Sequence, residues 1–192
     1  MVTPFKEDGS IDFDVLHSLT DYLIQGGVDY LVVNGTTAEN PVLNDNEKQA
    51  ILNEVVKAND GRVPVVFGLG GNHTNQVLES LFQFDMSGVS ALLSVTPYYN
   101  KPGQRGLYAH FGALAEVSPL PIILYNVPGR TGIHLQTDTV LALAKKYPQC
   151  IGIKEASGDF RHITRLIKER PREDFAVISG DDALTLPLIA SG

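Results

Sequence analysis

Hydrophobic and polar positions follow two periods along this chain of 192 residues. Short apolar runs, typical of buried strands, occupy residues 28–33, 63–67, 89–95, 121–126, 150–155 and 175–179. Between them, apolar residues recur at helical spacing over residues 12–25, 44–60, 74–88, 104–116, 138–147, 160–170 and 182–190. Asn44 and Glu47 resemble a capping box for the second of these helices, and Thr74 is expected to cap the third. Residues 1–3 resemble the end of one more strand, stopped by Pro4. Regular alternation of strand and helix predicts parallel βαβ units with helices outside.

Two α/β architectures have this alternation, a doubly wound open sheet and a (β/α)8 barrel. An open sheet concentrates its site near one switch point, whereas a barrel builds its site from the carboxyl ends of many strands. Unusual residues stand at or just beyond the ends of different strands, namely Thr36, Tyr99, Tyr125, Lys154 and Gly180. This distribution favours the (β/α)8 barrel.

The predicted barrel is incomplete. Seven strand signals are present, the first of them clipped, whereas a whole barrel usually needs about 250 residues. We therefore expect residues 1–192 to be one partial barrel domain that carries the catalytic residues, with no second domain. The start of strand 1, strand 8 and the C-terminal helices would be missing, so we expect this segment to be unstable alone.

Composition narrows the function classes. The chain is 43% hydrophobic with a net charge of -7, a balance that argues against a nucleic-acid or anionic-membrane surface. No apolar run approaches the roughly 20 residues of a membrane span, and the first residues lack a signal-peptide core. We expect a cytoplasmic protein. The single cysteine, Cys150, cannot form an internal disulfide, and burial as a small hydrophobic residue is its expected state.

The strand at residues 150–155 carries the strongest chemical signal. Side chains alternate between the faces of a strand, so Ile151 and Ile153 share one face while Gly152 and Lys154 share the other. If the isoleucines meet helices, Lys154 points into the interior, where poor solvation lowers the pKa of its amine. A neutral amine can attack a carbonyl and form a Schiff base. The alternative is a strand-end lysine that reaches water or pairs with Glu155.

The remaining motifs are weak one by one. Backbone N–H groups of Gly35-Thr36-Thr37 could hold a carboxylate, although such a pair of threonines is often only part of a turn. Tyr125 is typical of a buried ring at a strand end, and Tyr99 of packing or an interface. Arg130 can clamp a carboxylate, although loop arginines are usually solvated. Their coincidence at one rim with the lysine predicts a single site.

Cofactor and metal motifs are not found. Gly68-Leu69-Gly70-Gly71 follows a strand, but the third glycine of a dinucleotide fingerprint would fall at His73. The histidines show no metal-ligand spacing, and Asp181-Asp182 is better explained as a helix cap. We expect neither a metal nor an organic cofactor.

These residues resemble a known family. The segments V-T-P-F, G-T-T-A-E, V-T-P-Y-Y-N, I-L-Y-N-V-P-G-R-T-G, I-G-I-K-E-A-S-G and S-G-D-D occur in the order and approximate spacing of the dihydrodipicolinate synthases. The resemblance covers essentially the whole chain. The wider superfamily, with N-acetylneuraminate lyase and 2-keto-3-deoxy-sugar acid aldolases, shares the Schiff-base lysine and the strand-end tyrosine. The threonine pair, the tyrosine pair and the arginine resemble those of the synthases rather than those of the other members.

The resemblance implies a reaction without a cofactor. Lys154 would form a covalent imine with pyruvate, and the derived enamine would attack L-aspartate-4-semialdehyde, giving 4-hydroxy-tetrahydrodipicolinate in the diaminopimelate route to lysine. Tyr125 would be the general acid and base, and Thr36 would connect it to Tyr99 in a proton relay. In the family that tyrosine comes from the neighbouring subunit, so a homodimer or homotetramer is implied.

The resemblance also assigns the substrate contacts. Thr37, in the Gly35 loop, would hold the pyruvate carboxylate, and Arg130 the carboxylate of the semialdehyde. Gly180 would leave room beside the imine. Two alternatives remain open: a retro-aldolase that releases pyruvate from a sugar acid, and a non-catalytic pyruvate-binding protein.

Overall fold

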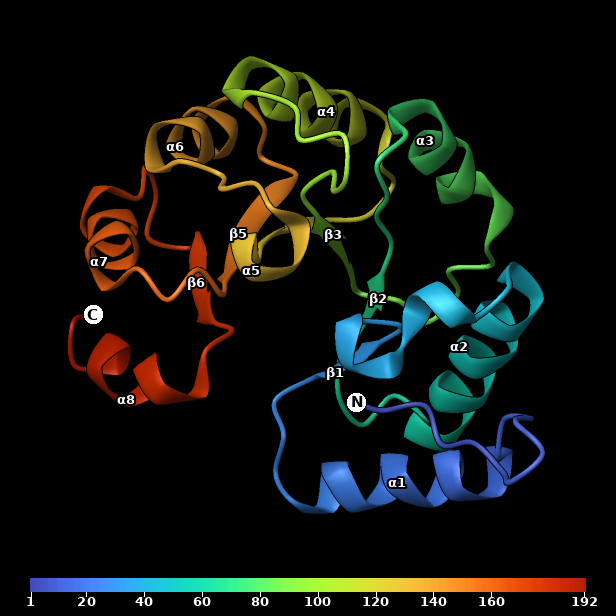
Figure 1. Ribbon diagram of the computed structural model, residues 1–192. Coiled ribbons are helices and arrows are strands. Elements are labelled where there is room, and N and C mark those ends of the chain that lie inside the picture. Colours follow the sequence, from blue (N-terminus) through green and yellow to red (C-terminus); the bar gives the residue numbers. More distant parts are fainter. The chain divides into compact units, whose positions relative to one another are not determined.

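The computed structural model describes residues 1–192, which form two compact units. One unit contains residues 1–69 and 82–93, and the other contains residues 70–81 and 94–192. Helix α3 (Thr74–Gln83) and strand β3 (Ala91–Val95) each have residues in both. Strands and helices alternate along the chain in each unit, as the sequence predicted (Figure 1).

The first unit holds the N-terminal strands and helices. Its elements are α1 (Phe13–Gln25), β1 (Leu31–Val33), η1 (Thr36–Ala38), η2 (Asn40–Val42), α2 (Asp45–Asn59) and β2 (Val65–Gly68). Strands β1 and β2 run parallel, with Val33 opposite Phe67, and β2 pairs in parallel with the first residues of β3. Val33 and Phe67 are both fully buried, so the core of this unit lies along the strands.

The capping box predicted at the start of α2 is present. The Asn44 side chain accepts a hydrogen bond from the Glu47 N–H, and the Glu47 carboxylate accepts one from the Asn44 N–H. Leu52 and Val55 of α2 are buried, and the helix contacts both α1 and β1. Burial of a leucine or valine side chain is worth about 1.5–3 kcal/mol, so this face anchors α2.

The second unit holds the strand with Lys154. Its elements are α4 (Gln104–Val117), β4 (Ile122–Asn126), α5 (Pro128–Thr131), α6 (Thr137–Lys146), β5 (Cys150–Glu155), α7 (Phe160–Glu169), β6 (Ala176–Ser179) and α8 (Asp182–Ile189). Strands β4, β5 and β6 are parallel neighbours, and β5 pairs with both of the others.

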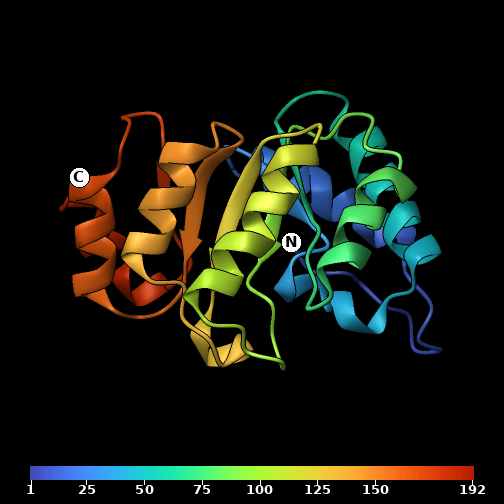
Figure 2. The same ribbon diagram turned by 90° about the horizontal axis from the view of Figure 1, so that it is seen from above.

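Helices cover one side of these three strands. Helix α6 contacts α4, α7 and β5, and α7 contacts β6. Figure 2 shows α4, α6 and α7 lying side by side. Their inward residues Phe111, Leu143 and Leu166 are fully buried. This helical layer fixes which side of each strand faces away from the helices.

Three local predictions were wrong. Residues 1–3 form no strand, so six strands are present instead of seven; the Met1 amino group donates to the Val32 carbonyl, and the Thr3 hydroxyl donates to Ala38. Thr74 does not cap α3 but is its first residue, and His73 Nδ1 accepts the N–H of Gln76. Helix α3 ends at Gln83, five residues before the predicted end near Gly88, which lies in a turn with a φ of +82°.

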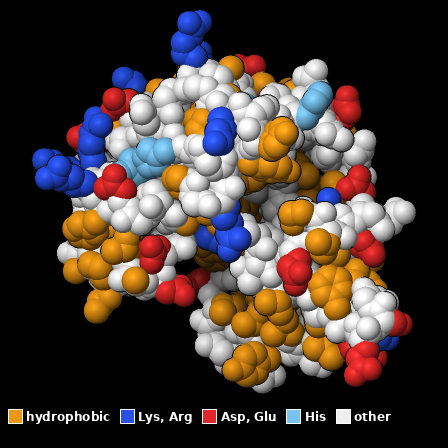
Figure 3. All heavy atoms as spheres, viewed as in Figure 1, with side chains coloured by type: hydrophobic (Ala, Val, Ile, Leu, Met, Phe, Trp, Pro, Cys, Tyr) orange, Lys and Arg blue, Asp and Glu red, His pale blue; other side chains and the backbone are white.

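The surface carries both charges and exposed apolar groups. None of the helices combines the length and the apolar character needed to cross a membrane. On the face in Figure 3, acidic and basic side chains are interspersed and hydrophobic side chains reach the surface. Among the exposed apolar residues are Leu186 and Ile189 of α8.

Candidate active site

Lys154 lies near the carboxyl end of β5, half-buried and without an ion pair. Burial lowers the pKa of its amine, as predicted, because a charged ammonium loses solvation there. The alternative pairing with Glu155 does not occur, since that carboxylate lies on the opposite face of the strand and pairs with His162. Lys154 is therefore biased toward the neutral amine that a nucleophile requires.

Tyr125, on β4, and Gly180, directly after the last residue of β6, flank the lysine. Tyr125 lies opposite Lys154 in the β4–β5 register and is only 6% exposed. The Lys154 Nζ lies 4.8 Å from the centroid of its ring. On the other side, a Cβ at Gly180 would lie 3.2 Å from Lys154 Cε, so the glycine leaves space along the lysine side chain. The structure thus brings these three predicted residues together.

Arg130 and Tyr99 belong to the same unit and lie on exposed turns. Arg130 was expected in a loop, but Pro128 starts a single helical turn, α5, that carries it. Tyr99 is 89% exposed and has a φ of +68°, an uncommon backbone conformation for a bulky residue. Asn100 anchors this turn by donating to the Asn72 carbonyl at 3.0 Å. Both side chains are available to a ligand or a second subunit.

Gly35, Thr36 and Thr37 lie in the first unit, directly after β1. Thr36 and Thr37 are exposed on the 3-10 helix η1, which Gly35 caps. Asn34 has a φ of +55°, and its carbonyl accepts from Asn40 Nδ2 at 2.7 Å. Together with the bond from the Thr3 hydroxyl to the Ala38 carbonyl, these contacts hold the loop that carries the two exposed threonines. The predicted roles of these residues stay predictions.

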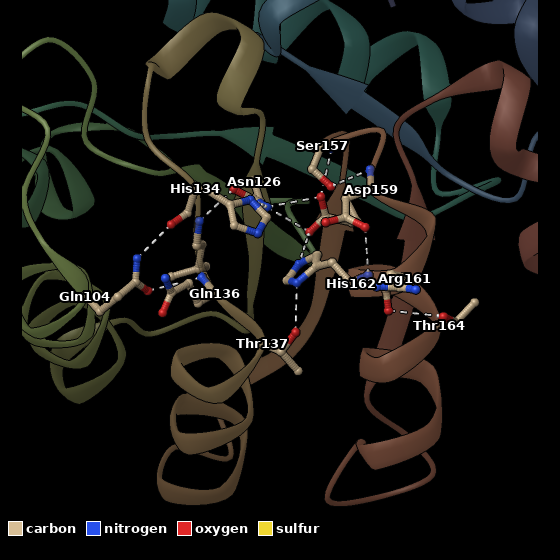
Figure 4. A network of polar contacts seen from close by, with 12 residues as sticks. Gln104, Asn126, His134, Gln136, Thr137, Ser157, Asp159, Arg161, His162 and Thr164 are labelled. Carbon is tan, nitrogen blue, oxygen red and sulfur yellow. Dashed lines mark hydrogen bonds and ion pairs between the residues drawn. The ribbon is translucent and has the colours of Figure 1, made fainter.

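A buried polar cluster lies behind Lys154, and sequence reasoning missed it. Glu155 is fully buried and interacts with Asn126 and His162 (Figure 4). His162 Nδ1 also meets the Thr137 hydroxyl at 2.7 Å, and its ring packs edge-on against His134. The available signal was the charge at the strand end, because a glutamate after an inward lysine must point toward the helices.

The structure contains no group of three or more His, Cys, Asp or Glu side chains arranged to hold a metal ion. Asp181 caps α8 by accepting the Ala183 N–H, as predicted. Cys150 is fully buried, and burial raises the pKa of its thiol to about 11.

Fold and site together define a class of protein: an α/β chain that is part of a (β/α)8 barrel, with a half-buried lysine near a strand end. The profile of the Dihydrodipicolinate synthetase family matches residues 1–192. The chain belongs to this family.

Similar proteins and solved structures carry the name of this family. The 4-hydroxy-tetrahydrodipicolinate synthase of Flavobacterium psychrophilum is 54% identical, over 100% of this chain and 65% of the relative. The crystal structure of dihydrodipicolinate synthase from Bacillus anthracis is 46% identical with a TM-score of 0.95, covering 100% of this chain and 65% of that one. The chloride-inhibited enzyme of Acinetobacter baumannii, complexed with pyruvate, is 41% identical with the same TM-score and coverage. The chain spans about two thirds of the length of these relatives.

Proposed function

We propose that the protein containing this chain condenses pyruvate with L-aspartate-4-semialdehyde to form 4-hydroxy-tetrahydrodipicolinate. The observation that carries the proposal is Lys154, whose amine is half-buried, unpaired with any carboxylate and 4.8 Å from the ring centroid of Tyr125. Family membership supports it, because the similar proteins are named as this synthase. The pyruvate complex of the Acinetobacter baumannii enzyme supports the first substrate.

The chemistry follows from a neutral amine at this position. The Lys154 amine adds to the ketone carbon of pyruvate, and loss of water leaves an imine. Loss of a methyl proton gives an enamine, whose carbon attacks the aldehyde while the aldehyde oxygen takes up a proton. The amine of the second substrate then displaces Lys154 and closes the ring. No cofactor is needed, because the protonated imine on Lys154 accepts the electron pair that remains when the methyl proton leaves.

Each predicted site residue receives one role. Tyr125 exchanges protons at the imine carbon and nitrogen, which suits a hydroxyl beside the amine. Thr36 and Tyr99 extend the proton path, with Tyr99 supplied by a second copy of the chain in a homodimer or homotetramer. Gly35 and Thr37 bind the pyruvate carboxylate, and Arg130 binds the semialdehyde carboxylate. These two carboxylate-binding groups match the two acidic substrates. Cytoplasmic location stays a prediction.

Trapping of the imine tests the proposal. The protein, at its full natural length, is incubated with pyruvate and borohydride and then digested for mass spectrometry. We expect one reduced pyruvate adduct, on the peptide that contains Lys154, and none after Lys154→Arg. Lys146→Arg, a change at an exposed lysine of α6, serves as the matched control and should label like the wild type.

The second substrate is assigned by activity. Addition of L-aspartate-4-semialdehyde should discharge the imine and consume pyruvate. Release of pyruvate from N-acetylneuraminate would instead indicate the retro-aldolase, and a folded protein without any adduct would indicate a binding protein.

A further inference from the structure

The residues that follow Tyr125 and Lys154 form a buried polar pair. Asn126 lies opposite Glu155 in the β4–β5 register, one step beyond the pair of Tyr125 and Lys154. Because side chains alternate along a strand, Asn126 and Glu155 point to the other side of the sheet, behind the proposed catalytic pair. Both are fully buried.

Hydrogen bonds fix the orientation of Asn126. Its Oδ1 accepts the N–H of Leu135 at 2.9 Å, so its amide nitrogen must face Glu155. That nitrogen donates to both carboxylate oxygens of Glu155, at 3.1 and 2.9 Å. It also lies 3.1 Å from Nδ1 of His134 (Figure 4). A single side chain thus connects β4 to both carboxylate oxygens on β5.

Glu155 is held as a carboxylate. Burial raises its pKa, but hydrogen bonds from His162, Ser157 and Asn126 outweigh that effect and lower the pKa below its ordinary value. The His162 Nε2 lies 3.0 Å from Oε2, and the Ser157 N–H donates to Oε1 at 2.8 Å. An ionised carboxylate only accepts, so every partner must donate. Removal of any donor leaves a buried charge without full compensation.

We propose that Asn126 and Glu155 are positioning residues, which clamp β4 to β5 and so fix the separation between Tyr125 and Lys154. The inference rests on the proposed function, because it concerns the same lysine. The Ala156 N–H also donates to the Asn126 carbonyl at 2.9 Å, so the clamp joins side chain and backbone at one level. Small displacements of reacting groups are costly: a shift of about 1 Å can reduce a rate about 100-fold.

A reciprocal exchange tests the clamp. Asn126→Asp alone places two carboxylates face to face, and Glu155→Gln alone can place two amide nitrogens face to face. In the double variant the new amide at position 155 can donate to the new carboxylate at position 126. The acceptors for the Leu135 and Ser157 N–H groups remain, and the net charge is unchanged. His162 Nε2 would then accept from the new amide in its other neutral tautomer, with Nδ1–H donating to the Thr137 hydroxyl.

The readouts are the rate of borohydride-trapped adduct formation and the steady-state constants, measured on the protein at its full natural length. Each single variant should lose about 10- to 100-fold in kcat and in trapping rate, with the KM for pyruvate changed less than about threefold. The double variant should recover to within about fivefold of the wild type. Gln104→Ala is the matched control, because Gln104 of α4 donates to the His134 carbonyl and accepts from the Thr139 hydroxyl of α6, and makes no hydrogen bond to β4 or β5. It should lower the melting temperature but leave kcat within about twofold.

The outcomes separate the two proposals. A wild type that forms no adduct overturns the proposed function and the inference with it. Single variants that stay folded and react at the wild-type rate overturn the inference alone. So does a double variant that regains the wild-type melting temperature but no activity, since stability would then be the only role of the pair. Rescue of activity by the exchange supports the clamp.

Discussion

Lys154 shows how one position acquires reactivity from its surroundings. Its amine has no carboxylate partner and is half-buried beside the Tyr125 ring. Desolvation therefore shifts the equilibrium toward the neutral amine, without an opposite charge to restore the ammonium. The adjacent Glu155 does not reverse this effect, because its carboxylate is hydrogen-bonded to Asn126 and His162 on the other face of the sheet.

This lowered pKa predicts the pH dependence of adduct formation. Protonated amine is unreactive, so the trapping rate should rise with pH and reach half its maximum below the pKa of a solvated lysine. A lysine-containing peptide of unfolded sequence, treated with pyruvate under the same conditions, gives the reference curve. Coincident curves for peptide and protein would refute the lowered pKa.

Gly180 makes a second prediction at the same scale. In Gly180→Ala, the added Cβ would lie 2.8 Å from Ala156 Cβ and 3.2 Å from Lys154 Cε. Overpacking of this kind costs typically about 1–3 kcal/mol, so crowding of the lysine should slow adduct formation about tenfold to 100-fold. The matched control is Gly103→Ala at the start of α4, where a Cβ would meet nothing within 4 Å. An equal effect of both changes on the trapping rate would contradict the assignment of space beside the lysine.

At the scale of elements, α3 and α4 are joined by a buried histidine. His110 of α4 is 3% exposed, and its Nδ1 lies 2.9 Å from the Thr74 hydroxyl of α3. Its Nε2 is buried without a hydrogen-bond partner. Burial lowers the pKa of His110 to about 4. The helix contact therefore depends on a neutral ring.

This histidine predicts acid sensitivity. The ring stays neutral in the folded protein while it protonates near pH 6.5 in the unfolded chain, so stability is complete above that pH and falls toward pH 4. The loss amounts to about 3 kcal/mol, at about 1.4 kcal/mol per pH unit. Urea unfolding of wild type and His110→Gln at pH 7 and pH 4 should show a pH-dependent loss that is smaller in the variant by about this amount. Equal losses in the two proteins would be inconsistent with a buried neutral ring.

Most elements could be predicted from the sequence because each carries a local signal. The helical face with Leu52 and Val55, and the apolar run of β5, are readable from periodicity alone. The strand predicted at residues 1–3 is absent, because an extended segment is a strand only when hydrogen bonds to a neighbouring strand complete its ladder. Thr74 does not act as the predicted helix cap, because its hydroxyl is hydrogen-bonded to His110, 36 residues further along the chain.

The candidate site was predictable where it depends on local sequence, and not where it depends on contacts between distant residues. Alternation along β5 was enough to place Lys154 on the inner face, and the register brought Tyr125 beside it. The partners of Glu155 could not be predicted, because Asn126 lies 29 residues before it and His162 lies on the next helix. Pairing between such positions depends on strand register and helix docking, which no local pattern encodes.

At the scale of the whole molecule, the proposal that Tyr99 completes the site of a second copy makes a prediction of its own. Tyr99 is 89% exposed on a turn where its φ is +68°, so its side chain is accessible to a second copy. Subunit mixing tests this. We expect Lys154→Ala and Tyr99→Phe proteins to be severely impaired when assayed separately, each lacking one group of the proposed site.

Mixed dimers then discriminate between the two arrangements. If Tyr99 acts across the interface, a mixed dimer has one site with both changes and one site with neither. An equal mixture, unfolded and refolded together, should therefore recover about a quarter of the wild-type activity, since about half of the dimers are mixed and each has one intact site. If Tyr99 acts within its own subunit, every site in the mixture lacks one group and no activity returns. Size-exclusion chromatography confirms that both variants still dimerise, so that a failure to recover activity counts against the crossed arrangement.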